Sequence, residues 1–207
     1  NTGQRGGTKN IDARVVNVWD NFQGDGTTIG IVDDGLDLTH EDIAPNAAAS
    51  GHFDWNGNDS NPAPDPTAED FHGTAVGGVA AGRGGNGVGI SGVAPHATLY
   101  GLRLISSPTT DGQDASAMDH LSSVIQIKNN SWGAPDDFAS LGYVGPLFAA
   151  ALDDAPSTGR GGKGTLFFWA AGNGRDIFDQ GNKDAAANNI HVIPVGALNN
   201  RGALSYY

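Results

Sequence analysis

The chain has 207 residues, a length that suits one domain with a central core rather than two independent domains. Its formal net charge of −12 argues against nucleic acid or an anionic membrane as a partner, because phosphate groups would be repelled, and favours a basic ligand. The chain contains no cysteine, which excludes disulfides, a thiol nucleophile and thiolate metal sites, and no stretch approaches the roughly 18 apolar residues needed to span a bilayer.

Short apolar, β-branched runs alternate along the chain with helix-compatible stretches. Apolar runs without a period of two indicate strands buried on both faces, and we predict such strands at 28–32, 98–105, 124–127, 165–170 and 191–195. Helices are predicted at 72–81, 115–121 and 146–153, and a long polar loop at 54–70. The alternation predicts an α/β domain, with a doubly wound, mostly parallel sheet and helices on both faces. In such sheets the functional site lies at the carboxyl ends of the strands.

Three junctions between these elements carry side chains that could do chemistry. Asp33 ends the first strand before a glycine turn, His72 opens a helix of small residues, and Asn173 lies between glycines after an apolar strand. A helix start favours the neutral imidazole that a general base needs, and an amide between glycines could donate a hydrogen bond to a developing oxyanion. Each junction alone is explained as well or better by an ordinary turn or a structural residue. Parallel strands bring all three to one edge of the sheet, and together they indicate a catalytic site.

The three junctions contain the motifs Val32-Asp33-Asp34-Gly35, His72-Gly73-Thr74 and Ala170-Ala171-Gly172-Asn173. These motifs resemble the aspartate, histidine and oxyanion-asparagine signatures of the subtilase family of serine endopeptidases, in the chain order of that family. The resemblance implies a three-layer, subtilisin-like fold and peptide hydrolysis by acyl transfer. It gives Asp33 the role of orienting the imidazole, His72 that of taking and returning the proton, and Asn173 that of binding the oxyanion.

Further motifs resemble those of the kexin and furin branch of the family, among them Asn129-Asn130-Ser131-Trp132-Gly133, Asp136-Asp137 and the stretch 159–164. The resemblance implies that Ser131, Trp132 and Gly133 pair with the substrate backbone beside the scissile bond. It implies an acid-lined pocket for the residue before that bond, with Asp136 and Asp184 as its acids. It also implies that Asp34 contacts the next residue out and that Glu69 is another acid of the cleft. The expected substrates are polypeptides cleaved after Arg or Lys, often after a basic pair.

The same resemblance implies two Ca²⁺ sites, and carboxylate and carbonyl oxygens are the ligands that this ion prefers. The first would use Asp42, Asn86 and the backbone oxygens near Val88 and Ile90. The second would lie beneath the basic-residue pocket and use Asp136 and Asp179. The alternative for residues 37–42 is a solvated polar turn.

The sequence departs from the family pattern in lacking a serine nucleophile. The family carries it in a Gly-Thr-Ser-Ala-type turn downstream of the asparagine, and no such segment occurs here. Neither Ser131 nor Ser205 has that context. We therefore expect residues 1–207 to be one N-terminal portion of the catalytic domain, with the remainder of that domain, and a pro-segment or chaperone, as candidate partners. The absence of the cysteines found in eukaryotic members suggests a bacterial protein, secreted or periplasmic.

Three other functions stay open from the residues alone. A catalytically incomplete fragment or pseudoprotease could serve as a binding module. The stretch 87–92 has the glycine spacing of a dinucleotide fingerprint, but it follows a helix and leads to a strand, opposite to what that motif needs. A metal-dependent phosphohydrolase could use Asp33 and Asp34, yet no phosphate-binding loop accompanies them.

Overall fold

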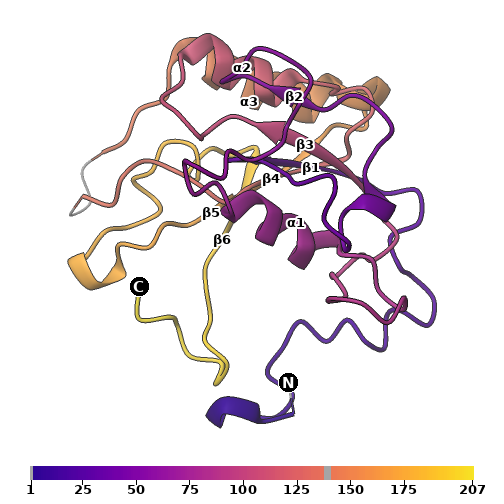
Figure 1. The fold of residues 1–207 in the computed structure, drawn as a ribbon. Helices are drawn as coiled ribbons and strands as arrows, with labels where there is room; N and C mark the ends of the chain where they lie inside the picture. Colours follow the sequence, from indigo (N-terminus) through magenta and orange to yellow (C-terminus); the bar gives the residue numbers. More distant parts are fainter. Residues whose placement is uncertain (1, 138–140) are drawn as a thin grey trace.

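The structure, a computed structural model, describes residues 2–137 and 141–207. Six strands form one sheet in the order β2-β3-β1-β4-β5-β6 (Figure 1). They are β1 Thr28–Asp33, β2 Phe53–Asp54, β3 Thr98–Arg103, β4 Ile127–Asn130, β5 Leu166–Ala170 and β6 Val192–Val195. Every neighbouring pair is parallel, so the carboxyl ends of all the strands face the same edge. The predicted parallel α/β sheet is confirmed.

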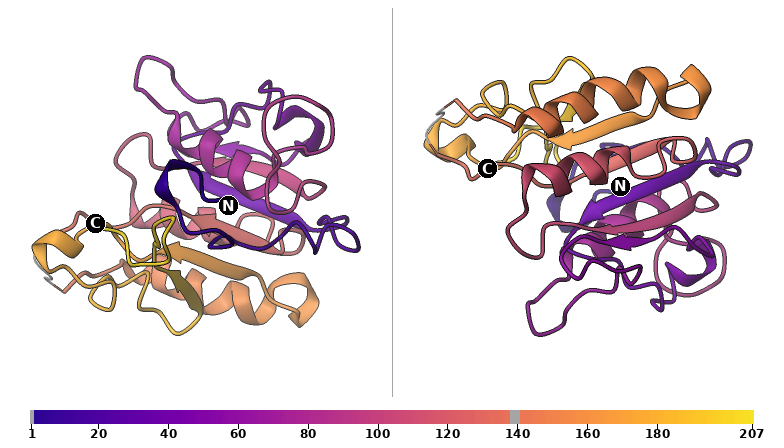
Figure 2. Two further views of the ribbon diagram at one scale, coloured as in Figure 1. Left: turned by 90° about the horizontal axis from the view of Figure 1, so that it is seen from below. Right: turned by 90° about the horizontal axis from the view of Figure 1, so that it is seen from above.

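In the described ranges, three α-helices cover the two faces of the sheet, namely α1 His72–Ala81, α2 Asp111–Asp119 and α3 Pro146–Gly162. Figure 1 shows α2 and α3 above the sheet and α1 below it. Seen from above, α2 and α3 lie side by side (Figure 2). Short 3-10 turns occur at Gln4–Gly6, Ala44–Asn46 and Arg175–Ile177. The three-layer arrangement is therefore also confirmed.

Each face of the sheet has its own apolar core. The core under α2 and α3 includes Val32, Met118 and Leu152, and the core over α1 includes Ile31 and Leu99. Strand β1 contributes to both cores because successive side chains of a strand point to opposite faces. This double burial is the reason that its sequence is apolar without alternation.

The fourth strand begins three residues later than predicted. The sequence predicts a strand at 124–127, whereas β4 spans Ile127–Asn130. The amides of residues 124 and 125 instead donate hydrogen bonds to the Leu121 carbonyl and close a turn after α2. The strand then continues through Lys128 and two asparagines, which give no apolar signal in the sequence.

The helices above the sheet also differ from the prediction. Helix α2 begins at Asp111 rather than at residue 115, because Thr110 and Gln113 form a capping box that satisfies its first amides. Helix α3 passes the predicted end at residue 153 and includes Pro156, although Gly159 to Gly161 leave helical backbone angles. The sequence does not predict the two-residue strand β2, which lies at the start of the predicted loop. Helix α1 has the predicted bounds.

The N-terminal segment before β1 lies beside the C-terminal segment that follows β6 (Figure 2). The Thr8 amide donates to the Asn200 carbonyl at 2.9 Å, and Arg201 Nε donates to the Gly6 carbonyl at 3.1 Å. Within the described ranges, no helix is both long enough and apolar enough to cross a membrane.

Lys128 carries a fully buried ammonium group in the core between β4 and α2. Its Nζ donates to the carbonyl of Ala117 at 2.9 Å and also to that of Met118, two carbonyls at the C-terminal end of α2. Such carbonyls lack partners within their helix, so the lysine acts as a C-terminal cap. Burial lowers the pKa of Lys128 to about 7, against the opposing effect of Asp119.

The buried lysine predicts a pH-dependent stability. A lysine in the unfolded chain has a pKa of about 10.4, so between about pH 7 and pH 10 the unfolded chain binds more protons than the folded one. The free energy of unfolding should therefore rise with pH in that window, by up to roughly 1.4 kcal/mol per pH unit. Lys128→Met should lose this rise in urea denaturation series, and the exposed-site control Lys163→Met should keep it. If the free energy of unfolding changes with pH in the same way in all three proteins, Lys128 is not the source of the rise.

Candidate active site

The carboxyl edge of the sheet brings the predicted residues close together. Asp33 ends β1 in register with Arg103, the last residue of β3. On the other side of β1, Val32 is in register with Asn130, which ends β4 and precedes the Ser131–Gly133 segment. Strand β5 ends at Ala170, just before Asn173. The parallel register thus places the ends of β1, β4 and β5 at one edge, and the helix start that carries His72 packs against the turn after β1.

Asp33 and His72 form a hydrogen-bonded pair. His72 Nδ1 lies 2.8 Å from Asp33 Oδ1, although the two residues are 39 positions apart in the sequence. The histidine side chain is 56% exposed, whereas the aspartate side chain is fully buried. When Nδ1 carries the proton that it donates to Asp33, the lone pair of Nε2 is left to accept a proton from another group.

The buried carboxylate of Asp33 is poised to balance a charge on the imidazole. Burial raises the pKa of Asp33 above its ordinary value, and the hydrogen bonds from His72 and from the Asp34 amide oppose that rise. The Asp34 amide lies 2.9 Å from Oδ1. Among the described residues, Oδ2 of Asp33 has no hydrogen-bond partner. A positive charge on His72 would therefore stabilise the ionised form of this buried carboxylate.

The two acids predicted to line the cleft near His72 have different environments. The Asp34 carboxylate accepts hydrogen bonds from the backbone amides of His72 at 3.0 Å and Gly73 at 2.7 Å. Glu69 is exposed and has a left-handed backbone with φ of 59°. Asp34 is therefore occupied with the start of α1, while the Glu69 side chain faces solvent three residues before His72.

The Ser131–Gly133 segment continues directly from β4 and is fixed by its tryptophan. Trp132 Nε1 donates to the Val32 carbonyl at 3.0 Å, and its ring meets that of Trp169 edge-on with centroids 4.6 Å apart. The Ser131 hydroxyl accepts a hydrogen bond from Asn129 at 2.8 Å. A side chain at Gly133 would begin 2.8 Å from Asp184 Oδ2, so this position requires the close approach that glycine allows.

Asn173 is exposed at the turn that follows β5. Its backbone amide donates to Asp136 Oδ1 at 2.9 Å, which fixes the turn. Its side-chain amide has no partner among the described residues and can donate to a ligand. A free donor on a fixed turn is the arrangement that oxyanion binding needs.

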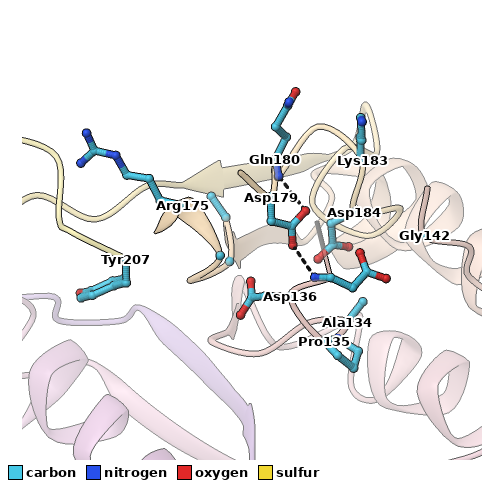
Figure 3. A pocket seen from close by; sticks show the side chains of 15 residues that line it. Ala134, Pro135, Asp136, Gly142, Arg175, Asp179, Gln180, Lys183, Asp184 and Tyr207 are labelled. Atoms are coloured by element: carbon cyan, nitrogen blue, oxygen red, sulfur yellow. Dashed lines mark hydrogen bonds between the residues drawn. The ribbon is translucent and has the colours of Figure 1, made fainter. Parts of the chain in front are cut away.

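Three of the predicted acids lie around one pocket beyond Asn173. Asp136, Asp179 and Asp184 line it, and Figure 3 shows their carboxylates close together while the side chains of Arg175 and Lys183 point away. Each carboxylate accepts a backbone hydrogen bond: Asp136 from Asn173, Asp179 from Gln180 at 2.7 Å and Asp184 from Ala186 at 3.0 Å. The pocket therefore presents fixed negative charge, which suits a cationic side chain.

The residues predicted for the first Ca²⁺ site lie together. Asp42 is buried, and both its carboxylate oxygens lie 3.2 Å from the Ile90 amide. A side chain at Gly89 would begin 2.2 Å from both oxygens, so the 86–90 loop packs its backbone directly on this carboxylate. Asn86 turns its side-chain oxygen to the Val88 amide at 3.1 Å. In this structure these side-chain oxygens accept from backbone amides, although carboxylate and amide oxygens are ligand types that a hard cation prefers.

For the second Ca²⁺ site, Asp136 and Asp179 flank Gly174, where a side chain would begin 2.8 Å and 2.5 Å from their respective Cβ atoms. Across the described ranges, no group of three or more histidine or acidic side chains is placed to hold a metal ion. Either cation site would therefore depend on backbone carbonyl oxygens as well as on carboxylates.

An ion-pair network around Arg103 was not predicted from the sequence. Its guanidinium donates to Asp54 and Asp70 at 2.8 Å each, and its Nε donates to the Asp34 carbonyl at 2.9 Å. The Ser106 hydroxyl donates to the same Asp70 carboxylate at 2.6 Å. This network joins the ends of β1, β2 and β3 to the predicted loop. Its one sequence signal is a lone arginine at the end of an apolar strand, preceded in the chain by the acid-rich loop that follows β2.

The sequence matches the peptidase S8 family model, described as the subtilase family, over residues 24–207. The chain belongs to the subtilase family. Two animal relatives are similar to this subtilase chain over its whole length. PC3-like endoprotease variant B of Hydra vulgaris is 38% identical over 209 residues, and human neuroendocrine convertase 2 is 35% identical over 211 residues. The alignments cover 29% and 33% of these relatives, so the chain spans a third or less of their length.

A solved structure supports the same fold. The serine protease of Aeromonas sobria, in complex with a chaperone, has a TM-score of 0.76 to this subtilase chain and 25% sequence identity. The match covers 89% of this chain and 34% of the protease. The subtilisin-like fold implied by the motifs is thereby confirmed.

The Arg103 network should contribute strongly to the stability of this subtilase chain. Arg103→Met would leave the buried Asp54 and Asp70 carboxylates unpaired, at a cost of about 3–5 kcal/mol in the free energy of unfolding. Lys163→Met, at an exposed position, should change it by less than about 0.5 kcal/mol. Chemical denaturation of the three proteins measures both values.

The same network fixes the direction of a pH effect. Burial acts to raise the pKa of Asp70, but hydrogen bonds from Arg103 and Ser106 outweigh it and hold the pKa below its ordinary value. The stability from this pair should therefore be present above about pH 4 and lost as the pH falls below that value. Equal stabilities of Arg103→Met and the unmodified protein near neutral pH would refute the role of the network.

Proposed function

We propose that the chain forms the N-terminal part of the catalytic domain of a serine endopeptidase of the subtilisin and kexin type. The observation that carries the proposal is the buried Asp33 carboxylate hydrogen-bonded to the exposed His72 ring at the carboxyl edge of the sheet. Family membership and the convertase relatives support the same reaction class.

Each residue of the site has a separate role in acyl transfer. His72 accepts the proton of a serine hydroxyl through Nε2 as that serine attacks the peptide carbonyl, and returns it to the leaving amine. Asp33 keeps the Nδ1 proton in place and stabilises the imidazolium that forms. The side-chain amide of Asn173 donates to the oxyanion, a contribution of about 2.7–4 kcal/mol in comparable sites. Ser131 to Gly133 pair with the substrate backbone as an added strand.

The nucleophilic serine in this proposal belongs to a part of the parent protein beyond the present sequence. The hydroxyl of Ser131 accepts a hydrogen bond from Asn129. Ser205 lies in the C-terminal segment, where its backbone carbonyl accepts a hydrogen bond from Arg175 at 2.6 Å. The remainder of the catalytic domain would then be the obligatory partner of this chain. A pro-segment or chaperone is a further candidate partner, since the similar Aeromonas sobria protease is seen with a chaperone.

We further propose that the acid pocket selects Arg or Lys before the scissile bond. Asp184 turns one oxygen to the Ala186 amide and the other toward Gly133, which places negative charge next to the substrate-pairing segment. Asp136 is tied to the proposed oxyanion turn by its bond to the Asn173 amide. A basic side chain would thus reach fixed carboxylates while its carbonyl lies at Asn173.

Calcium would have a structural role in this proposal. Asp42, Asn86 and the carbonyls near Val88 and Ile90 would hold one ion, which would tie the 86–90 loop to the 37–42 turn. Asp136 and Asp179 would contribute to a second ion beneath the pocket. A bound Ca²⁺ would neutralise the negative charge of carboxylates that are buried or lie close to one another.

We place the protein outside the cytoplasm, secreted or periplasmic, as a secondary proposal. The bacterial source expected from the missing cysteines stays a prediction, because the relatives at 35–38% identity are animal proteins and the solved neighbour is bacterial. A catalytically incomplete fragment that acts as a binding module is the alternative function. Peptide cleavage by the intact parent protein distinguishes the two.

Fluorogenic peptides should separate these possibilities. The parent protein should cleave peptides that end in Arg or Lys and leave those that end in Phe or Leu, with His72→Ala as the blank. Asp184→Asn should lower kcat/KM for the basic peptides by about 30-fold or more, because a desolvated charge pair is broken. Asp176→Asn, an exposed change outside the pocket lining, is the matched control. Preference for Phe or Leu would refute the basic specificity, and no cleavage of either set would favour the binding module.

Calcium binding should appear as a shift in thermal stability. At a Ca²⁺ concentration 100 times Kd, binding stabilises the folded state by about 2.7 kcal/mol, which corresponds to a Tm rise of roughly 5–10 °C for a chain of this size. Asp42→Asn should remove most of the rise, while Asp65→Asn, in an exposed turn, should keep it. An equal rise in both variants would contradict the Asp42 site.

A further inference from the structure

The Asp34 carboxylate caps the helix that carries His72. Its Oδ2 accepts from the His72 amide at 3.0 Å and its Oδ1 from the Gly73 amide at 2.7 Å. These amides have no acceptor within the helix, because the first four N–H groups of an α-helix lack one. Phe71, the residue before the helix, provides no side-chain cap. The helix therefore depends for its first hydrogen bonds on a residue 38 positions earlier in the sequence.

We propose that Asp34 is a positioning residue for His72, which fixes the backbone of the histidine while Asp33 fixes its ring. The proposal rests on the proposed function for its kinetic consequence, but its structural part does not. Two adjacent carboxylates at the end of β1 would thus hold one side chain at two points.

Close packing makes the cap short and stiff. A side chain at Gly73 would begin 2.2 Å from the Gly35 carbonyl oxygen, 2.8 Å from Asp33 Cβ and 3.0 Å from Asp34 Oδ1. The helix start is thus pressed against the turn that follows β1. At the next residue, the Thr74 hydroxyl accepts from the Asp37 amide at 2.9 Å. The junction is held on both sides of residue 73.

Asp34 is itself held by the Arg103 network. The Asp34 carbonyl accepts from Arg103 Nε at 2.9 Å, and that guanidinium is fixed by Asp54 and Asp70. Through this bond to Arg103 at the end of β3, the sheet limits the movement of Asp34 and so of the start of α1. A free surface aspartate would lack that support.

This arrangement changes the expected role of Asp34 in catalysis. Both carboxylate oxygens are engaged in charge-assisted hydrogen bonds, which are about twice as strong as neutral ones. A basic side chain of a substrate would have to share them. Loss of Asp34 should therefore disturb His72 first and substrate binding second.

The structural test uses Asp34→Ala and Asp34→Asn with Asp65→Asn as the matched control. Asp65 also accepts two bonds, from the amide and hydroxyl of Thr67, but it lies in an exposed turn and its carboxylate does not bond the first amides of α1. In Asp34→Ala, amide hydrogen exchange at residues 72 and 73 should accelerate by roughly 10- to 100-fold, since a bond to a charged acceptor is lost. The low-field Nδ1 proton resonance of His72 in ¹⁵N-histidine-labelled protein should broaden or move. Asp34→Asn, which keeps one oxygen, should give smaller changes of the same sign, and it replaces Asp34→Ala if that variant does not fold.

The kinetic test compares two peptides that share Arg before the scissile bond and carry either Lys or Ala one residue further out. A positioning role predicts a fall in kcat of about 100-fold for both peptides, the order expected from a misplacement of about 1 Å, with KM nearly unchanged. A rise in KM confined to the Lys peptide would overturn the proposal and make Asp34 a substrate contact. Unchanged exchange and an unchanged His72 resonance in both Asp34 variants would also overturn it. If the unmodified protein cleaves neither peptide, the proposed function fails, while the exchange and resonance measurements still decide the role of Asp34.

Discussion

The end of β1 and the start of α1 meet with no room for a side chain at residue 73, and the geometry of the candidate site depends on this contact. It brings the Asp33 carboxylate within 2.8 Å of the His72 ring. It also brings the carboxylate of Asp34 to the first amides of the helix. A larger residue at 73 would push the helix away from the sheet and break both sets of hydrogen bonds at once.

The buried charges of Arg103, Lys128 and Asp33 each have fixed partners. Arg103 is bound by two carboxylates and a carbonyl, and Lys128 by two carbonyls at the end of α2. Asp33 is bound by His72 and a backbone amide. A buried charge without partners would cost several kcal/mol, so these groups specify how the strands and helices meet. The same network that stabilises the sheet edge thus also orients the groups proposed for catalysis.

The acid pocket follows the same principle at the surface. The carboxylates of Asp136, Asp179 and Asp184, which are among the acids that line it, each accept a hydrogen bond from a backbone amide. Because the nearby Arg175 and Lys183 point away, the negative charge is not cancelled within the pocket (Figure 3). The pocket therefore gathers negative charge at one place on the surface of an acidic chain.

The sequence by itself determined the parallel α/β sheet and the bounds of α1, and it placed Asp33, His72 and Asn173 at junctions between elements, because apolar runs and glycine-flanked junctions are local signals. It predicted β4 and the start of α2 wrongly. Lys128 is buried because it caps the end of α2, the helix that precedes β4, and the weight of the Thr110 capping box was missed. Only the tertiary structure decided the Arg103 network and the engagement of Asp34 with α1. Those contacts join residues more than 30 positions apart, and their energy depends on burial and direction, which no local pattern of residues encodes.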